Sequence, residues 1–587
     1  MKRNNNTIIV TIIIILIVLV IVPIQMVQAN NNNFNSKCLD HYGNKCNQVN
    51  LWINFKDKAL NINNNNNNNG ITNESIKRRL KKNLPIDNAL DQEIDENYIK
   101  SVLEIDSRIQ KRSISRWLNA FSVSIDIGSL DGIENKKQEL NGLIEKILSL
   151  SSVSNVEEVI KFNGIKQESK LVLDKSNLQV INSNTPKAST KYGDTDYGNS
   201  FTQLNQLSIP NAHSKGYTGK GVSILIIDSG FYKDHECLKN VNIGGEYDFI
   251  NKLNNTQGLD GDSQNVHGTY VLSNLAGNLP GKMIGVAYDS KYYLAKTEIV
   301  QDESPIEEDY FIDALEWGER NGVDIVSASL GYSQWYKYWE LKGKSSISKA
   351  VDIATEKGVL VVISSGNGGY TGVAPPADSN GAISVGAVDE TGEWASFSSV
   401  GPTSDGILKP EVVAQGVLNY AANSESPSSY SYPSGTSLSA PLIAGVAALV
   451  LEAHPEYTPE QVKQALFSTA SQANKPDIYK GYGLVNAIKA IDFKLNNQLN
   501  SNNISGNNTI PLVPCGYTCA QNQGKCNEYN CFECLAPDIK PHKVKTPISC
   551  DGHSVATDQW NGASTISTFH WGVSTLILIC VTLLVTN

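Results

Sequence analysis

One serine of the sequence is placed as the nucleophile of an acyl transfer would be. Ser437 lies within residues 434–441, directly before an apolar run at 442–451. Pro441 is tolerated in the first turns of a helix, so this pattern predicts a helix that begins near Thr436. Ser437 would then lie at a helix N-terminus, where free N–H groups and the helix dipole stabilise a developing anion. Such a nucleophile still needs a base to remove its proton.

Three further polar residues lie where predicted strands end or helices begin. Asp228 closes the apolar strand 224–227, Asn367 follows the apolar run 359–363, and His267 opens a predicted helix. Singly, each is typical of a strand-end cap, a turn or a helix cap. Together, Asp, His and Ser in this order indicate a catalytic triad, in which His takes the serine proton and Asp orients His.

From residue 216 onward, the elements that must position these residues have the sequence pattern of an α/β domain. Continuous runs of β-branched and apolar residues alternate with helical segments, which is typical of parallel strands buried on both faces. We expect a three-layer sandwich with a mostly parallel central sheet and with ligands at the carboxyl ends of its strands. The expected strands are 222–227, 292–295, 324–327, 359–363 and 383–388. The expected helices are 268–275, 307–321, 346–356 and 458–469, the last with a capping box at 458–461.

Four motifs in chain order carry a resemblance to a known family. They are Ile-Asp-Ser-Gly at 227–230, His-Gly-Thr-Tyr at 267–270, Ser-Gly-Asn-Gly at 365–368 and Ser-Gly-Thr-Ser-Leu-Ser-Ala-Pro at 434–441. On these residues the chain resembles the subtilisin-like serine proteases (subtilases) from about residue 197 to 490. The resemblance implies a serine endopeptidase with a subtilisin-like fold.

The resemblance also implies a role for each matching residue. Ser437 would attack the peptide carbonyl, His267 would be the general base and acid, and Asp228 would orient the imidazole. The side-chain amide of Asn367 and the backbone N–H of Ser437 would hold the oxyanion. The residues that would bind substrate are Ser329, Leu330, Gly331, Ser365 and Gly366.

The chain departs from the family pattern at two positions. Tyr270 replaces a second histidine of the first helix, which is not catalytic in the family. Leu438 replaces the methionine that usually follows the nucleophile. A thioether is oxidised by peroxide and a leucine side chain is not, so we expect an activity that tolerates peroxide.

Residues 30–191 are expected to be a propeptide that follows a signal peptide at 1–29. Residues 50–162 loosely resemble the inhibitory pro-segment of these proteases. Strands at 51–55, 121–127 and 156–162 and helical segments at 76–82, 92–112 and 138–150 predict a small antiparallel sheet with two helices. The catalytic domain would span 192–494. Residues 174–191 form a polar connector, and cleavage is expected between 184 and 197.

After a polar linker at 495–513, residues 514–552 are rich in cysteine. In the secretory pathway this spacing favours disulfides over a metal site assisted by His542 or His553. Residues 561–587 end in an apolar run that is typical of a lipid-anchor signal, with a retained membrane tail as the alternative. The six cysteines are Cys515, Cys519, Cys526, Cys531, Cys534 and Cys550.

Composition restricts the partners. The formal charge of −10 argues against nucleic acid, and a membrane is expected only through the C-terminal anchor. Protein or peptide substrates and the chain's own propeptide, as inhibitor, remain as partners. The expected reaction needs no cofactor. No carboxylate-dense loop marks a calcium site, but many members of the family bind calcium, so calcium stays open as a ligand that the sequence does not reveal. The expected glycosylation sequons begin at Asn73, Asn254, Asn503 and Asn507.

The sequence therefore predicts a secreted or cell-surface serine endopeptidase that is made as a self-inhibited precursor. One alternative is a catalytically inactive binding protein of the same fold at the cell surface, with the cysteine cluster making the contacts. Another is an esterase or lipase, but no Gly-x-Ser-x-Gly elbow surrounds Ser437.

Overall fold

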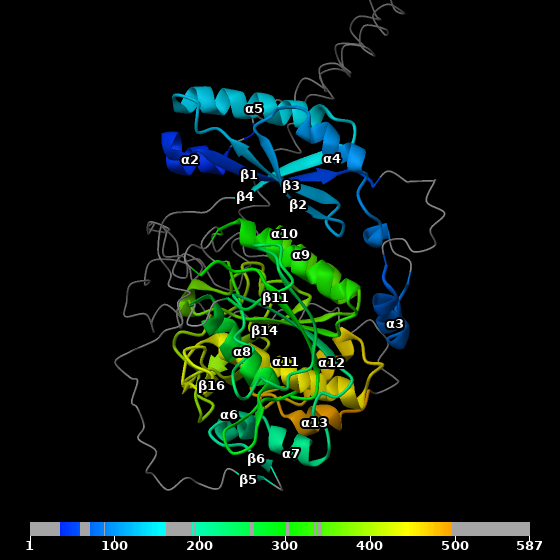
Figure 1. Cartoon of the computed structure of the whole chain (residues 1–587), viewed down its shortest axis with the longest axis vertical. Helices are drawn as coiled ribbons and strands as arrows, with labels where there is room; N and C mark the ends of the chain where they lie inside the picture. Colours follow the sequence, from blue (N-terminus) through cyan, green and yellow to red (C-terminus); the bar gives the residue numbers. More distant parts are fainter. Residues whose placement is uncertain are drawn as a thin grey trace, which may run out of the picture. The chain divides into compact units, whose positions relative to one another are not determined.

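The computed structural model describes residues 34, 36–58, 71–86, 89–159, 191–192, 195–258, 263–300, 304–332, 336 and 343–495. By their contacts, two compact units are distinguished (Figure 1). Unit 1 comprises residues 1–57, 95–112 and 121–160, and unit 2 comprises 58–94, 113–120 and 161–587. The signal peptide, most of the polar connector, the cysteine-rich module and the C-terminal tail predicted from the sequence lie outside the described residues.

Unit 1 is built on a four-stranded sheet, in the order β2-β3-β1-β4. The strands are β1 (Gln48–Phe55), β2 (Ile109–Ser115), β3 (Ala120–Asp126) and β4 (Val153–Val159), and β1 pairs with β4 antiparallel. The helices of this unit are α2 (Lys37–Tyr42), α4 (Glu96–Leu103) and α5 (Ile133–Ser149). The small α+β unit predicted from the sequence is confirmed.

The prediction of one helical segment over 92–112 is wrong. Helix α4 ends at Leu103, and β2 begins at Ile109. Ile109, Ser113 and Ser115 are buried, whereas the charged neighbours of Ile109 in this strand are exposed or half-buried. The charged residues concealed the strand because its buried positions are mostly serines, which carry little hydrophobic signal.

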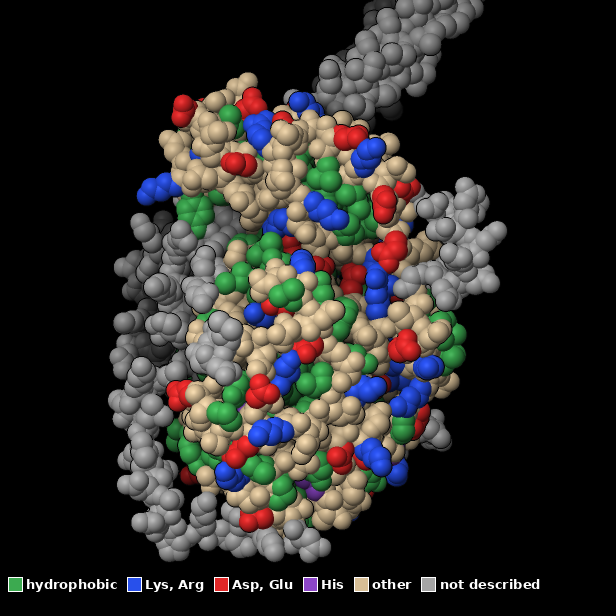
Figure 2. All heavy atoms as spheres, viewed as in Figure 1, with side chains coloured by type: hydrophobic (Ala, Val, Ile, Leu, Met, Phe, Trp, Pro, Cys, Tyr) green, Lys and Arg blue, Asp and Glu red, His purple; other side chains and the backbone are tan. Residues whose placement is uncertain are grey.

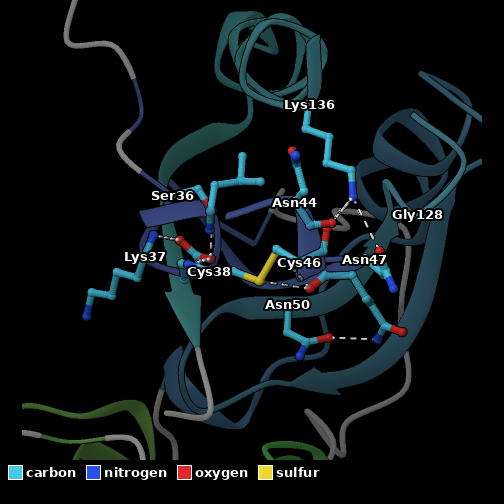
Figure 3. The surroundings of a disulfide bond; sticks show 12 residues. Ser36, Lys37, Cys38, Asn44, Cys46, Asn47, Asn50, Gly128 and Lys136 are labelled. Atoms are coloured by element: carbon cyan, nitrogen blue, oxygen red, sulfur yellow. Dashed lines mark hydrogen bonds between the residues drawn. A yellow bond between two sulfur atoms is a disulfide. The ribbon is translucent and has the colours of Figure 1, made fainter. Parts of the chain in front are cut away.

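A disulfide in unit 1 joins Cys38 and Cys46 (Figure 3). Beside it, Lys136 Nζ donates to Asn44 O at 2.9 Å and to Cys46 O at 2.8 Å. The sequence analysis placed disulfides only in the C-terminal cluster and missed this pair.

Unit 2 contains a seven-stranded parallel sheet in the order β15-β14-β13-β12-β7-β11-β8. The five central strands confirm the prediction from apolar runs. The edge strands β8 and β15 were missed; β8 contains two consecutive glycines and lacks a continuous apolar run. The strands are β7 (Ser223–Asp228), β8 (Ile243–Asp248), β11 (Lys291–Lys296), β12 (Ile325–Ala328), β13 (Leu360–Ser364), β14 (Ala382–Val388) and β15 (Val412–Gln415).

Helices cover both faces of this sheet. Helices α8 (Val266–Ala276) and α11 (Thr436–Ala453) pack against each other and share one hydrophobic core with Ile224 and Ile226 of β7 (Figure 1). On the other face, α9 (Ile306–Arg320) packs beside α10 (Ser346–Glu356), and Gly318 of α9 lies against Leu225 of β7. Because alternate residues of a strand face opposite sides, the sheet is sandwiched, and the predicted three-layer architecture is confirmed.

The remaining elements of unit 2 are short. The capping box predicted at Thr458 is present, with its side chain accepting from the backbone of Gln461. The helices are α3 (Asn73–Lys81), α6 (Phe201–Gln206), α7 (Ile209–Ser214), α12 (Pro459–Ser468) and α13 (Ala487–Ile491). The strands are β5 (Lys191–Tyr192), β6 (Thr195–Asp196), β9 (Asn278–Leu279), β10 (Met283–Ile284), β16 (Ala421–Ala422) and β17 (Tyr430–Ser431).

Within the described residues, α11 alone is long and apolar enough to cross a membrane, and 89% of it is buried inside the molecule. It is therefore the core helix that the sequence predicted. On the face of the molecule drawn in Figure 2, basic and acidic side chains are interspersed.

Candidate active site

The structure brings Asp228 and His267 together, although 39 residues separate them. Asp228 is the last residue of β7 and is fully buried. His267 is the second residue of α8, and its Nδ1 lies 2.7 Å from Asp228 Oδ1. The same carboxylate oxygen accepts from the backbone N–H of Ser229 at 2.7 Å. Since Nδ1 faces the carboxylate, Nε2 is the ring nitrogen left to act on a substrate or a nucleophile.

The close packing of α8 on the end of β7 depends on a glycine. A Cβ on Gly268 would lie 2.2 Å from the carbonyl oxygen of Gly230. No side chain fits at that distance, so the glycine after His267 lets the helix reach the turn after Asp228. This contact explains in physical terms why His-Gly and Asp-Ser-Gly occur together in the sequence.

The charges around His267 favour the protonated imidazole. Burial opposes its positive charge, but the Asp228 carboxylate outweighs burial and raises the pKa of His267, with a smaller contribution from Glu298. Glu298 follows β11, the strand beside β7, and its carboxylate accepts from the Tyr332 hydroxyl at 2.7 Å. Glu298 was not among the site residues predicted from the sequence. Its only signal was its position just after a predicted strand.

Ser437 is the second residue of α11, as predicted, and only 9% of the residue is exposed. Its hydroxyl donates to the backbone oxygen of Ser329 at 3.3 Å, and this structure has no hydrogen bond from it to His267. In exchange, Ser329 Oγ donates to the backbone oxygen of Ser437 at 2.8 Å. That oxygen lies four residues before Pro441, which has no N–H to complete the helical hydrogen bond. The Ser329 hydroxyl replaces the missing donor.

We predict that Ser329→Ala lowers the free energy of unfolding by about 1–3 kcal/mol, because the Ser437 carbonyl would lose its donor in a buried place. Denaturant unfolding in a Ser437→Ala background, which removes the hydroxyl proposed to be the nucleophile, measures the change. Ser428→Ala removes an exposed hydroxyl and serves as the control. Equal stability of the two variants would contradict the role assigned to Ser329.

Asn367 lies in the loop after β13, beside the start of α11. Its Oδ1 accepts from the backbone N–H and from the hydroxyl of Thr436, each at 2.9 Å. With the oxygen held by Thr436, the amide nitrogen of Asn367 is the group left to donate elsewhere. The structure therefore places an amide donor beside the N-terminus of the helix that carries Ser437, as an oxyanion site requires.

The predicted substrate-binding residues come from two neighbouring strand ends. Ser329 follows β12 and is buried, whereas Leu330 and Gly331 are half-buried. A Cβ on Gly331 would lie 3.7 Å from the Cβ of Ala374. After β13, Ser365 is buried, and its backbone N–H donates to Val385 O. The backbone N–H of Gly366 donates to Thr436 Oγ1 at 3.2 Å. Sequence reasoning thus assigned both segments to the correct edge of the sheet.

Within the described part of the chain, no group of three or more His, Cys, Asp and Glu side chains could hold a metal ion. An imidazole contacts a buried carboxylate at the end of a parallel strand, and an amide donor lies beside the helix N-terminus that carries an alcohol. This set can transfer an acyl group through the serine oxygen.

Comparisons with known proteins agree with this chemistry. The Subtilase family model matches residues 219–484, and the model of the Peptidase S8 propeptide domain, Bacteroidota, matches residues 50–170. Subtilisin from Bacillus pumilus is 33% identical over 288 residues, which are 48% of this chain and 95% of that protein. Subtilisin BL from Lederbergia lenta is 34% identical over 285 residues, which are 48% of this chain and 96% of that protein.

The solved structure of fervidolysin from Fervidobacterium pennivorans, a keratinolytic enzyme related to subtilisin, resembles this fold with a TM-score of 0.53. The sequence identity is 20%, and the match covers 77% of this chain and 62% of fervidolysin. At this identity the likeness bears on the fold alone.

Proposed function

The chain belongs to the subtilase family of serine endopeptidases, and we propose that it cleaves proteins through an acyl-enzyme formed on Ser437. The observation that carries this assignment to particular residues is the 2.7 Å contact between His267 Nδ1 and Asp228 Oδ1. It leaves Nε2 of an oriented imidazole to act as the base. Two motifs 39 residues apart in the sequence build that arrangement.

In the first step, the Ser437 hydroxyl leaves Ser329 O and donates to His267 Nε2. The imidazole takes the proton as Oγ bonds to the substrate carbonyl carbon, and the carbonyl π electrons move onto oxygen. The peptide C–N bond then breaks, and imidazolium gives its proton to the leaving amine. Water then attacks the acyl-enzyme ester in the same way, with His267 as the base. This step releases the new carboxyl group and restores Ser437. Asp228 stays ionised and stabilises the imidazolium.

The negative oxygen of each tetrahedral intermediate needs donors that are already in place. We assign this role to the amide nitrogen of Asn367 and to the backbone N–H of Ser437 at the start of α11. Loss of one such donor in subtilisin costs roughly 3 kcal/mol of transition-state stabilisation. Residues 329–331 are proposed to pair with the substrate backbone as an added strand. Ser365 and Gly366 are proposed to line the other side of the specificity pocket. The base, nucleophile and donors all come from the chain, so the proposed reaction requires no cofactor.

The match to a propeptide domain indicates a precursor, in which the N-terminal region inhibits the protease. We propose that the enzyme cuts its own connector between residues 184 and 197. We also propose that a signal peptide at 1–29 directs the chain to the secretory pathway. The Cys38–Cys46 disulfide supports an oxidising compartment, because disulfides rarely persist in the cytosol. A lipid anchor at 561–587 remains part of this proposal.

Covalent labelling tests the function. A sulfonyl fluoride should modify the purified enzyme once, at Ser437, and should stop it from digesting a denatured protein. Ester turnover alone would be insufficient, because serine proteases also hydrolyse esters. An unlabelled chain, or a labelled chain that digests esters but no protein, would contradict the proposal. The first outcome would favour the inactive binding protein, which no feature of the site supports.

The pKa of His267 sets the acid limit of the activity. The base must be neutral, and its pKa is raised above the ordinary value by Asp228 and Glu298. We predict that kcat/KM falls as the pH is lowered through a value above about 6.5, the ordinary pKa of histidine. Glu298→Gln removes one of the charges that raise the pKa of His267, so the acid limb of the pH profile should move to lower pH. A pH profile of kcat/KM for both enzymes checks the shift, and an unchanged limb would contradict the role of Glu298.

Leu438 predicts tolerance of oxidants. The residue is fully buried directly after Ser437, and leucine has no sulfur to oxidise. We expect the enzyme to keep most of its activity in peroxide that inactivates the Leu438→Met variant. The variant conserves volume and therefore serves as a matched comparison. Equal rates of inactivation for both enzymes would contradict the prediction.

A further inference from the structure

A basic arm of the propeptide belongs, by its contacts, to unit 2 rather than to the propeptide sheet of unit 1. We define the arm as residues 71–94, of which 71–86 and 89–94 are described. It begins with helix α3 and contains two adjacent arginines, Arg78 and Arg79, that are both buried. Adjacent buried arginines require partners, since an unpaired buried charge is strongly destabilising.

Arg78 makes contacts across to the ends of two helices of the protease. Its Nη2 lies 2.6 Å from Glu319 Oε1 in the last turn of α9, and its Nη1 donates to Lys357 O at the end of α10 at 2.6 Å. The Ser75 hydroxyl of the arm donates to the same Glu319 oxygen. Burial opposes the negative charge of Glu319, but Arg78 and Arg79 outweigh it and lower the pKa of Glu319.

Arg79 connects the same carboxylate to the arm itself. Its guanidinium binds both oxygens of Asp91, at 2.7 and 2.9 Å, and its Nη2 lies 2.8 Å from Glu319 Oε1. Asp91 in turn lies 2.7 Å from Lys357 Nζ. All four side chains are at most 1% exposed. The arm is therefore closed into a loop by Arg79 and Asp91, and both residues also reach the protease.

A second propeptide segment, residues 113–120, joins this charge cluster. Arg116 Nη2 lies 3.2 Å from Glu319 Oε2, and Arg116 Nε lies 3.2 Å from Glu316 Oε2. The backbone N–H of Trp117 donates to Glu316 Oε1 at 3.2 Å. Both oxygens of Glu319 thus accept from propeptide arginines, one from the arm and the other from this segment.

The carboxyl-terminal ends of α9 and α10 add their own attraction for cations. Besides Arg78, Lys82 Nζ donates to Gly358 O at 3.2 Å, and the Thr72 hydroxyl donates to Arg320 O. The last carbonyls of a helix lack intrahelical donors and carry the negative end of the dipole. A Cβ on Gly358 would lie 2.3 Å from Leu84 of the arm. The arm therefore fits closely over these helix ends.

The formal charges of the two surfaces are complementary. Apart from the exposed pair of Glu93 with Arg320, which adds one charge of each sign, the propeptide supplies four cations and one carboxylate, for a net +3. The cations are Arg78, Arg79, Lys82 and Arg116, and the carboxylate is Asp91. The protease supplies three carboxylates, Glu316, Glu319 and Asp324, and one cation, Lys357, for a net −2. Such buried sets are stable only with near-complete pairing, so removal of one member should be costly.

This cluster lies at the edge of the sheet opposite the active site. Asp228 ends β7, so the triad is at the carboxyl ends of the parallel strands. Helix α9 leads from the end of β11 to the start of β12, and α10 leads to the start of β13. The last residues of both helices therefore lie at the amino ends of the strands. A substrate that occupies the catalytic edge does not contact the residues that bind the arm.

We propose that the carboxyl-terminal ends of α9 and α10 form an exosite for the basic arm, which holds the propeptide on the protease after the connector has been cut. The inference rests on the proposed function, since it concerns how that protease is released from its inhibitor. Cutting the connector would free the new N-terminus but leave the exosite occupied. Activation would then require a second event that dislodges the arm.

The test measures dissociation in the full chain with Ser437→Ala, so that catalysis is not needed. A recognition sequence for a site-specific protease is inserted in the connector, the chain is cut, and release of the propeptide is followed after dilution. Arg78→Met should speed release by roughly 100-fold, the effect of breaking a buried ion pair. Lys77→Met is the matched control, because Lys77 is exposed on the same helix. It should change the rate by less than about threefold.

Glu319→Gln keeps the side-chain shape and serves as the second variant if Arg78→Met does not fold. The double variant should speed release by much less than the product of the two separate fold-increases in release rate, since the residues are in direct contact. The exosite is refuted if Arg78→Met and Lys77→Met release the propeptide at equal rates, if the two changes multiply, or if the unsubstituted pieces separate at once. Because no variant depends on peptide hydrolysis, these results stand apart from failure of the catalytic proposal, which the labelling experiment detects.

Discussion

Replacing Ser437 with alanine is expected to lower kcat by about 10⁶-fold, the loss known for the nucleophile of subtilisin. The substitution removes the oxygen that forms the acyl-enzyme but keeps the helix N-terminus and its free N–H groups. Hydrolysis of a chromogenic peptide by the purified chain measures the loss. The same variant should accumulate as a precursor with an intact connector, because the proposed first cut is its own. Intact mass and N-terminal analysis of the product report that cut.

The control for this variant is Ser428→Ala, which removes an exposed hydroxyl from the loop before α11. It should keep full activity and normal processing. Two outcomes would be informative in different ways. Normal maturation of Ser437→Ala would show that an outside protease cuts the connector, whereas undiminished peptide hydrolysis would overturn the assignment of Ser437 as nucleophile.

Replacing Asp228 with asparagine is expected to lower kcat by about 10⁴-fold while the fold is retained, as in other serine proteases. The asparagine would offer His267 an amide of similar shape without the charge that stabilises imidazolium. An amide that donates to Nδ1 would also place the imidazole proton on Nε2, the wrong tautomer for a base. Steady-state kinetics on a peptide substrate and thermal unfolding of the variant separate loss of chemistry from loss of structure.

The residual activity of Asp228→Asn should also show a changed pH profile. Asp228 is the main group that raises the pKa of His267 against the effect of burial. Without the carboxylate, burial lowers that pKa, so the acid limb should move to lower pH. Asp234→Asn removes an exposed carboxylate and is the control for loss of charge. An Asp228→Asn enzyme with wild-type kcat would refute the proposed role of the carboxylate.

The structure places Asp228 and His267 at the predicted edge of the sheet, because each position depends on a local pattern with one physical consequence. A buried apolar strand that ends in a carboxylate places Asp228 at an edge of the sheet, and a helix that begins beside it places His267 there too. In a parallel sheet the carboxyl ends of all strands lie at the same edge, and ligands bind there. The order of the motifs therefore sufficed to predict that Asp228 and His267 would lie in contact.

Details inside the same site required the tertiary structure. Nothing in the sequence near Ser329 indicates that its hydroxyl would donate a hydrogen bond to the Ser437 carbonyl, 108 residues away. Glu298 similarly influences His267 only because β11 lies beside β7 in the sheet. Both effects arise from non-local neighbours, which hydrophobic periodicity does not encode.

The propeptide gives the same contrast on a larger scale. The sequence predicted a helical segment at 76–82, and Lys and Arg side chains such as those of Lys-Arg-Arg-Leu-Lys-Lys are rarely buried. Folding instead buries Arg78, Arg79 and Lys82 against the ends of α9 and α10. No local rule predicts this, because Glu319 and the carbonyl of Gly358, which help to offset the cost of burial, are more than 200 positions away.

By itself, the sequence predicted the class of fold, the strands at the centre of the sheet and the contact between Asp228 and His267, since those depend on periodicity and on chain order. Only the tertiary structure decided which groups form hydrogen bonds with these residues, which groups orient them and which charges shift their pKa values. It also decided where the basic arm lies. The physical reason is that burial of polar groups requires exact partners, and those partners are selected by the packing of distant segments.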